Sequence, residues 1–207
     1  MTGREFHSYI LTYDYDKWSF IDPKEAQKKL NLPRNPRDYT SIAVTTDDSN
    51  DEIVYASSMG DGVIQYKNGT PVQSYNEKNA FKETAGGYGS GYCYIDGLAF
   101  DKNGNLWMTS SEVNHAVLVL DKAGAWHRLD IEQLRGVYTI NDILITSTND
   151  KWIYVPRNTP KLVMIPNSES LDEVSSYEFT TLIDTDGKEL TPSNYTCVAE
   201  DKDGYIW

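Results

Sequence analysis

Short apolar runs alternate with polar turns throughout this chain, and one arrangement of the two returns. In the middle of the chain, residues 97–100 are mostly apolar, residues 101–104 form a polar turn that ends in glycine, and a second apolar run carries Trp107. The segment 197–207 repeats this order and ends in Trp207. Short apolar runs bounded by glycine turns are typical of antiparallel strands joined in hairpins. The pattern therefore predicts a β protein built from a repeated hairpin.

Two weaker copies complete the series and give its period. The four anchor positions follow one another at intervals of 53, 46 and 54 residues, and they are Val54, Trp107, Ile153 and Trp207. The third copy lacks the turn glycine, because residues 147–150 read Ser-Thr-Asn-Asp. A repeat of roughly 40–50 residues made of short strands is the signature of β-propeller blades. We therefore predict an all-β fold, a β-propeller of four-stranded antiparallel blades.

The repeat divides the chain into blades. Three complete blades are predicted at residues 40–75, 95–130 and 141–183, with half blades at residues 5–22 and 194–207. Because stacked repeats bury their apolar faces against one another, we expect one propeller rather than separate domains.

One short helix is predicted between the first half blade and the first complete blade, at residues 23–32. Asp22 can cap its N-terminus, Pro23 suits the first helical position, and Glu25 completes a capping box. The helix decorates the connection between blades.

The chain begins and ends inside a blade, which leaves two interpretations open. The two half blades could join as a split blade and close a four-bladed ring without open edges. Alternatively, the chain is a piece of a larger propeller. We favour the second interpretation, because a chain rarely ends on a buried strand tryptophan, as we expect Trp207 to be.

Composition excludes several classes of partner. The 207 residues carry a formal net charge of −12. Nucleic-acid binding needs a basic surface, and an anionic membrane would repel this chain. No apolar run reaches the roughly 18–20 residues of a membrane span. Residues 1–7 lack the apolar core of a signal peptide. We expect neither nucleic-acid binding nor membrane insertion of this segment.

The two cysteines give little information on redox compartment. Cys93 and Cys197 lie in different blades, so we expect both thiols to be buried and free. Two thiols alone do not make a metal site.

Propellers bind ligands on the face formed by the loops between blades and by the loops between second and third strands. The longest of these loops, residues 76–94, is rich in glycine and carries Tyr88, Tyr92 and Tyr94. It is no phosphate-binding loop, because no Gly-Lys-Ser/Thr sequence follows. Tyrosine rings can stack on a sugar and donate hydrogen bonds to its hydroxyls. The alternative is a linker that packs one or two tyrosines between blades.

Asp96 and Asp142 are the second candidate feature. Each lies 11 residues before its anchor, so both are expected where an innermost strand begins, facing the central channel. Two such carboxylates could hold a divalent cation. The corresponding residues of the other copies, Thr40 and Thr196, argue against a four-fold cage. The alternative is that each aspartate accepts backbone hydrogen bonds from a neighbouring blade.

Three basic residues complete the candidate ligand contacts. His115 lies in a loop of the same face, and Arg135 and Arg157 lie in two others. Paired arginines there would suit an anionic ligand group, and simple solvent exposure is the alternative. No nucleophile elbow or metal-ligand spacing is present. We therefore expect no enzymatic activity and no cofactor.

Two lines of the repeat resemble the two-component regulator propeller repeat. They are residues 101–107 and 200–207, and residues 191–194 (Thr-Pro-Ser-Asn) resemble the lead-in of that repeat. The resemblance covers nearly all of the chain from Ile10 onward. It implies a large periplasmic sensor propeller that precedes a histidine kinase.

A narrower resemblance is to PorZ-type proteins. It rests on residues 53–66, 74–79, 97–107 and 124–126. This resemblance implies a two-propeller surface protein without an enzymatic centre, associated with type IX secretion and with lipopolysaccharide. From these likenesses we expect a periplasmic or cell-surface location. We also expect a glycan, lipopolysaccharide or partner protein to bind the loop-rich face.

A third resemblance gives the alternative function. Two segments are similar to the repeat of metal-dependent lactonase-type propeller enzymes. They are residues 96–99, which begin with Asp96, and the Gly-Asn-Leu-Trp strand at residues 104–107. That similarity implies a calcium or zinc ion near Asp96 and Asp142.

Overall fold

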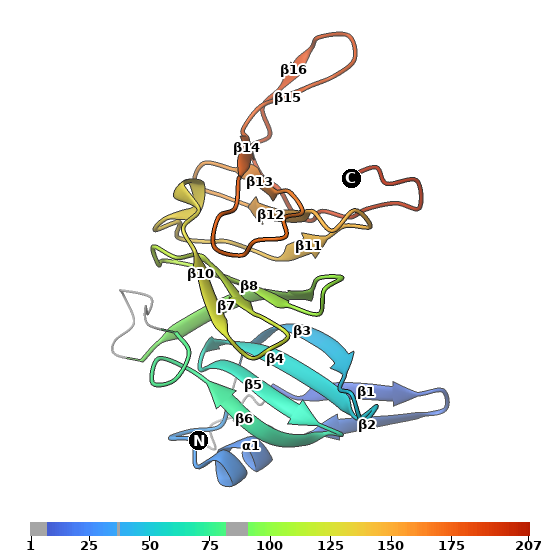
Figure 1. Cartoon of the computed structure of the whole chain (residues 1–207), viewed down its shortest axis with the longest axis vertical. Coiled ribbons are helices and arrows are strands. Elements are labelled where there is room, and N and C mark those ends of the chain that lie inside the picture. The colour runs from blue at the N-terminus through green and yellow to red at the C-terminus, as the bar shows by residue number, and fades with distance from the viewer. Residues whose placement is uncertain (1–7, 37, 82–90) are drawn as a thin grey trace, which may run out of the picture.

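The computed structural model describes residues 8–36, 38–81 and 91–207, which form blades stacked along the longest axis of the molecule (Figure 1). Each complete blade has four antiparallel strands in chain order. The first blade contains β3 (Tyr39–Thr46), β4 (Glu52–Gly60), β5 (Gly62–Lys67) and β6 (Thr70–Tyr75). The second contains β7 (Cys93–Phe100), β8 (Leu106–Ser110), β9 (Val117–Leu120) and β10 (Trp126–Leu129). The third contains β11 (Ile143–Ile145), β12 (Lys151–Val155), β13 (Lys161–Ile165) and β14 (Tyr177–Phe179). The predicted all-β fold of four-stranded blades is confirmed.

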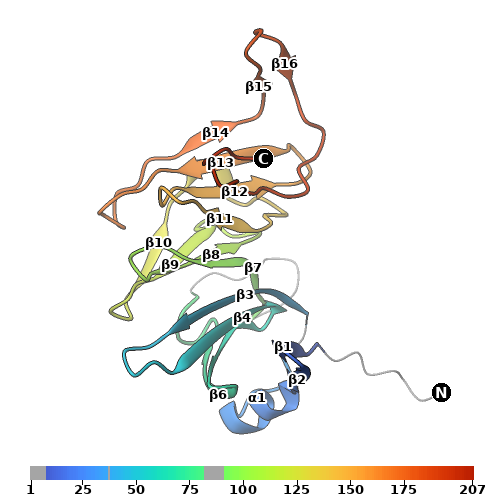
Figure 2. The ribbon, with the colours of Figure 1, turned by 90° about the vertical axis from the view of Figure 1, so that its right-hand side faces the viewer.

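Smaller elements flank the blades. At the N-terminal end lie the hairpin β1 (Ile10–Asp14) and β2 (Lys17–Ile21) and the helix α1 (Pro23–Leu30). The predicted cap is present, because Asp22 Oδ1 accepts a hydrogen bond from the Lys24 amide at 2.9 Å. A 3₁₀ helix (Glu132–Leu134) follows the second blade. The hairpin β15 (Leu182–Ile183) and β16 (Glu189–Leu190) projects from the third blade (Figures 1 and 2).

The first and second blades bury both of their faces. Alternate residues of β8 and β9 face opposite neighbours: Met108 and Leu118 pack against the first blade, whereas Trp107 and Val119 pack against the third. The other face of the first blade packs on α1 and the N-terminal hairpin, where Ile10 and Ala26 are buried. This two-sided burial explains why the strands read as continuous apolar runs. The first two blades also share an eight-stranded sheet, because β4 pairs with β7.

One turn recurs in six hairpins of the described chain. The amide of its first residue donates a hydrogen bond to the carbonyl of the fourth residue after it. The third residue after the first is a glycine or asparagine with positive φ, and its amide donates to the carbonyl of the first residue. In the third blade Asn149, at φ 70°, takes the place of the missing glycine. The first residues of these turns are Asp47, Asp101, Asp121, Thr146, Asp184 and Asp201.

These turns correct the register of the repeat. Trp107 is the sixth residue after Asp101, and Trp207 is the sixth after Asp201. The same count from Asp47 and Thr146 leads to Ile53 and Trp152, one residue before the anchors Val54 and Ile153 chosen from the sequence. The sequence pattern missed this shift because Ile-Val and Trp-Ile pairs are apolar at both positions.

Two expectations about burial near the C-terminus are wrong. Trp207 is 77% exposed and Cys197 is exposed, because no described blade packs over the hairpin formed by residues 199–207. Both thiols are free, and Cys93 is buried as expected. Within the described residues, β1 and β2 pair only with each other, and they lie far from the C-terminal segment (Figures 1 and 2).

The turn aspartate of the second blade is expected to be a major determinant of stability. Asp101 is 6% exposed and accepts hydrogen bonds from the amides of Asn103 and Asn105 and from Trp107 Nε1, each at 2.9 Å. Substitution Asp101→Ala leaves the buried Trp107 Nε1 and two turn amides without their acceptor, so the free energy of unfolding should fall by about 2–4 kcal/mol in urea titrations.

Asp201→Ala is the matched control. Asp201 makes the same bonds, to the amides of Asp203 and Tyr205 and to Trp207 Nε1, but around an exposed tryptophan. The loss should therefore be roughly 1 kcal/mol or less, since water replaces the lost partners. Equal losses in the two variants would contradict this account.

The two thiols are expected to differ in reactivity. Burial, followed by the nearby Glu77 carboxylate, raises the pKa of Cys93 to about 12. The thiolate is the reactive species, so a water-soluble disulfide reagent should modify only Cys197 in the native protein and both thiols in urea. Rapid native labelling of Cys93, read by mass spectrometry of tryptic peptides, would contradict the burial described.

Candidate functional site

The three complete blades converge on one depression of 330 Å³, which we name the mouth pocket. Its described lining combines hydroxyl, amide, carboxylate, phenol and thioether groups. β3 and β4 contribute from the first blade, β7 from the second, and β12 with the connection before β11 from the third. The lining residues are Thr40, Met59, Tyr94, Asp96, Thr139, Asn141, Asp142 and Tyr154.

Asp96 and Asp142 are brought together as the sequence predicts. They come from adjacent blades, and Gly97 is what allows the approach. A Cβ atom at Gly97 would lie 2.6 Å from Asp142 Oδ1 and 2.8 Å from the Ile143 amide nitrogen. Real Cβ atoms do not come so close to other atoms, so any larger residue would force the two blades apart at the pocket.

Hydroxyl groups join the neighbouring blades around this pocket. The Thr40 hydroxyl donates to the Ile95 carbonyl at 2.6 Å, and the Thr109 hydroxyl donates to the Asn141 carbonyl at 2.9 Å. The Tyr154 hydroxyl donates to the Thr196 carbonyl at 3.3 Å. Thr40 and Thr196, the predicted counterparts of the two aspartates, thus hold positions in the same ring of contacts.

Asp96 is half-buried and held by its own blade. Its Oδ2 accepts a hydrogen bond from the Ser111 hydroxyl at 2.8 Å, and Ser111 Oγ in turn accepts from the Ile140 amide at 2.8 Å. Burial raises the pKa of Asp96 to about 8, and the hydrogen bonds from Ser111 oppose this rise only in part.

Asp142 is more exposed, yet burial also raises its pKa. Its Oδ1 accepts from the amide of Ile143 at 2.9 Å. The alternative drawn from the sequence was that each aspartate accepts backbone hydrogen bonds from a neighbouring blade. The bonds seen for both carboxylates come instead from residues of their own blades.

The three tyrosines of the glycine-rich loop have different placements. Tyr94 lies in β7 and lines the mouth pocket, and burial raises its pKa to about 12. The ring of Tyr92 meets that of Tyr94 edge to face, with centroids 6.4 Å apart. Tyr88 lies outside the described residues.

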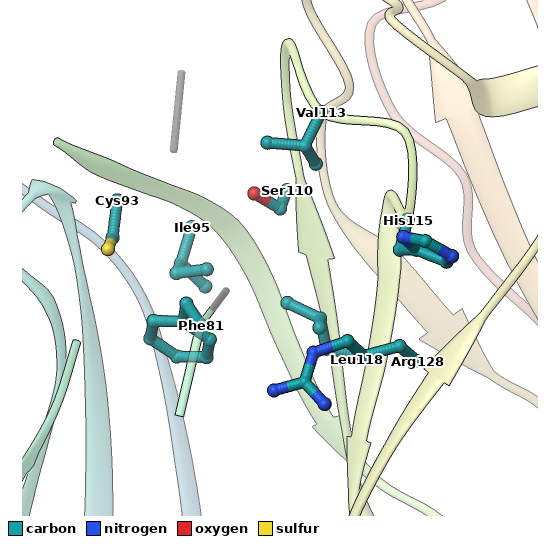
Figure 3. A pocket seen from close by; sticks show the side chains of 8 residues that line it. All are labelled: Phe81, Cys93, Ile95, Ser110, Val113, His115, Leu118 and Arg128. Carbon is teal, nitrogen blue, oxygen red and sulfur yellow. The ribbon is translucent and has the colours of Figure 1, made fainter. Parts of the chain in front are cut away.

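The basic candidates lie outside the mouth pocket. Arg135 is exposed and forms an ion pair with Asp130, with Nε 2.6 Å from Oδ1. Arg157 is exposed in the loop after β12. His115 lines a different cavity, between the first and second blades (Figure 3). The structure thus unites Tyr94, Asp96 and Asp142, and places His115, Arg135 and Arg157 elsewhere.

The cavity of His115 is small. Its volume is 10 Å³, about the space of one water molecule. Arg128 crosses it toward Phe81 (Figure 3) and donates from Nη2 to the Ala80 carbonyl. This cavity is part of the core between blades and has no room for a ligand.

Sequence reasoning missed four residues of the mouth pocket: Met59, Thr139, Asn141 and Tyr154. Met59 and Tyr154 belong to second strands, which the repeat treats as core. A signal for Tyr154 existed, because it is a polar aromatic residue in a buried strand. Its hydroxyl also accepts a hydrogen bond from Asn141 Nδ2 at 2.8 Å.

The site is not a preformed metal centre of three or more ligands. Among the residues that the structure describes, no group of three His, Cys, Asp or Glu side chains is placed to hold a metal ion. No described helix is long and apolar enough to cross a membrane.

The pH dependence of stability should report on Asp96. Its folded pKa of about 8 lies above the ordinary value, so between pH 4 and pH 8 the folded protein keeps a proton that the unfolded chain has lost. The unfolding free energy should therefore fall as pH rises through this window. Asp96→Asn should remove up to about 1.4 kcal/mol of that fall per pH unit.

Asp186→Asn serves as the control for this series, because Asp186 is exposed in the turn between β15 and β16. Its difference from the unmodified protein should stay constant with pH. A parallel pH profile for Asp96→Asn, measured by urea unfolding, would show that Asp96 titrates normally.

Comparison with known proteins comes from solved structures. No family model and no curated protein matches the chain. A solved structure of PorZ, described as an essential bacterial surface component of the type-IX secretion system of Porphyromonas gingivalis, matches with a TM-score of 0.81 at 20% identity. The match covers 96% of this chain and 27% of that chain.

Two extracellular domains from B. thetaiotaomicron match less closely. One belongs to a hybrid two-component system, with a TM-score of 0.51 at 19% identity over 79% of this chain and 19% of that chain. The other belongs to a one-component system, with a TM-score of 0.50 at 16% identity over 79% of this chain and 25% of that chain. These similarities establish the β-propeller fold, and this chain spans only a minor part of each matched protein.

Proposed function

We propose that this chain is a non-catalytic, extracytoplasmic binding module that binds a glycan at the mouth pocket. One observation carries the proposal: three blades place phenol, carboxylate, hydroxyl and amide groups around one open depression of 330 Å³. This volume lies within the range of small-molecule sites in proteins. The similarity to surface and extracellular propellers supports the extracytoplasmic assignment.

The lining suits the chemistry of sugars. A sugar presents hydroxyl groups around its ring and a weakly apolar face. Tyr94 can contact that face and hydrogen-bond through its hydroxyl, and Asp96 and Asn141 add polar groups at the rim. Met59 adds an apolar contact. A binding role uses all of these groups without requiring a nucleophile or a bound metal.

The charge of the lining distinguishes among the expected ligands. The described lining carries two carboxylates and no basic side chain. The phosphate groups of a lipopolysaccharide would be repelled there, since recognition of such groups relies on arginine and lysine. A glycan without phosphate is therefore preferred to lipopolysaccharide.

The proposal is tested on a glycan array with the unmodified protein and Tyr94→Phe. Removal of one hydroxyl that bonds to a sugar should weaken binding of the retained glycans roughly three- to tenfold. Tyr177→Phe is the control, because Tyr177 is an exposed aromatic residue of β14 outside the pocket. Its glycan binding should equal that of the unmodified protein.

Two results would overturn the proposal. One is the absence of saturable binding to any glycan. The other is an equal loss in Tyr94→Phe and Tyr177→Phe, which would place the glycan elsewhere on the surface.

A further inference from the structure

We infer that the glycan bound at the mouth pocket carries a protonated amine, which lies between the carboxylates of Asp96 and Asp142. The inference rests on the proposed function and specifies the ligand class for the same site. A free amino sugar, or a glycan with an amine substituent, is the ligand that this arrangement fits.

The geometry of the pocket supplies the first argument. Asp96 and Asp142 come from two adjacent blades and line the same depression, and Gly97 lets the Asp142 carboxylate approach β7. An ammonium group donates three hydrogen bonds and can bond to both carboxylates at once. A single hydroxyl group has one hydrogen to donate, so it can donate to only one of two ionised carboxylates.

The side walls supply the second argument. Tyr94 and Tyr154 flank the carboxylates, and Met59 lines the same depression. Aromatic faces attract ammonium groups, and this attraction grows where water is displaced. A thioether packs against the carbon skeleton next to the amine without competing for the charge.

The charges beyond the lining point the same way. The described groups that interact electrostatically with Tyr94, besides Asp96, are Glu112, Tyr92 and Tyr138, and those that interact with Tyr154 are Asp142 and Cys197. All of these are acidic or neutral. A cation entering the pocket is therefore attracted, in agreement with the net charge of −12.

A cationic ligand would offset the cost of ionising Asp96 in this pocket. Burial disfavours the charged form of this carboxyl group, and the repulsion from Asp142 adds to the effect. A bound ammonium group would stabilise both carboxylates in their charged forms.

A small metal ion fits the pocket less well. Calcium takes six to eight oxygen ligands, whereas the described residues bring two carboxylates together and no group of three or more metal-ligating side chains. An ammonium group is satisfied by two carboxylates and an aromatic wall.

The test uses chemical N-acetylation of a glycan that binds the unmodified protein. N-acetylation removes the positive charge and leaves the rest of the glycan unchanged. Binding is measured by titration calorimetry with EDTA present, so that metal bridging is excluded. The acetylated glycan should bind about tenfold more weakly, or worse, because charge-assisted hydrogen bonds are lost.

Variants locate the effect. In the double variant Asp96→Asn with Asp142→Asn, the amine form and the N-acetylated form of the glycan should bind with equal affinity. In Asp186→Asn, the affinity difference between these two forms should stay the same as in the unmodified protein. Asp142→Asn alone should reduce the difference several-fold. This single variant keeps the test decisive if the double variant does not fold, as checked by circular dichroism.

The outcomes separate the two proposals. If the retained glycans carry no amine, or if N-acetylation leaves affinity unchanged, the amine inference fails and glycan binding at Tyr94 stands. If the double variant keeps the full preference for the amine, the carboxylates do not hold it and the inference again fails. If no glycan binds at all, both proposals fail.

Discussion

Each blade of this protein is apolar on both faces, so a blade can bury its core only between two neighbours. Met108 and Trp107, adjacent in β8, are both fully buried but belong to different cores, one on each side of the sheet. Such packing fixes how closely the blades approach and therefore where their innermost strands meet. The mouth pocket is a consequence of that convergence. Its groups are held by strands whose positions are set by cores several residues away, which is how a rigid scaffold pre-organises a binding site.

Gly97 shows how tightly the site depends on the stack. It lies in β7 between the half-buried Asp96 and the core residue Leu98, and it leaves no space for a side chain against Asp142. A β-bulge in β7 between Ile95 and Leu98 shifts the register of the strand at this point. Bulges of this kind re-aim side chains next to functional sites. The same few residues therefore close the contact between two blades and turn Asp96 toward the pocket.

The fold could be predicted from the sequence because local and global signals agree. Turn aspartates, turn glycines and two-faced apolar strands all indicate stacked hairpins, and the structure shows them. Asp96 and Asp142 could both be placed near the channel because each lies shortly before a recognisable turn, although Asp96 lies five residues before Asp101 and Asp142 four residues before Thr146. The rest could not. The one-residue register error at Ile53 and Trp152 arose because apolar pairs look alike on either alignment. Met59 and Tyr154 were missed because a second strand reads as core until its distance from the channel is known. His115 and Arg135 could not be placed either, since loops carry no periodicity that fixes their direction.

Asp96 and Asp101 lie five residues apart in sequence and differ in the number of hydrogen-bond donors around their carboxyl groups. Asp101 is surrounded by donors: its carboxylate accepts from the amides of Asn103 and Asn105, from Asn105 Nδ2 and from Trp107 Nε1. Asp96, in the middle of β7, is held by Ser111 alone within the described chain, and burial raises its pKa to about 8. A carboxyl group with so few donors costs stability whenever it ionises. A ligand that donates hydrogen bonds to Asp96 at the mouth pocket would recover that cost on binding. The satisfied aspartate stabilises the fold, whereas Asp96 is the one that the proposed ligand would use.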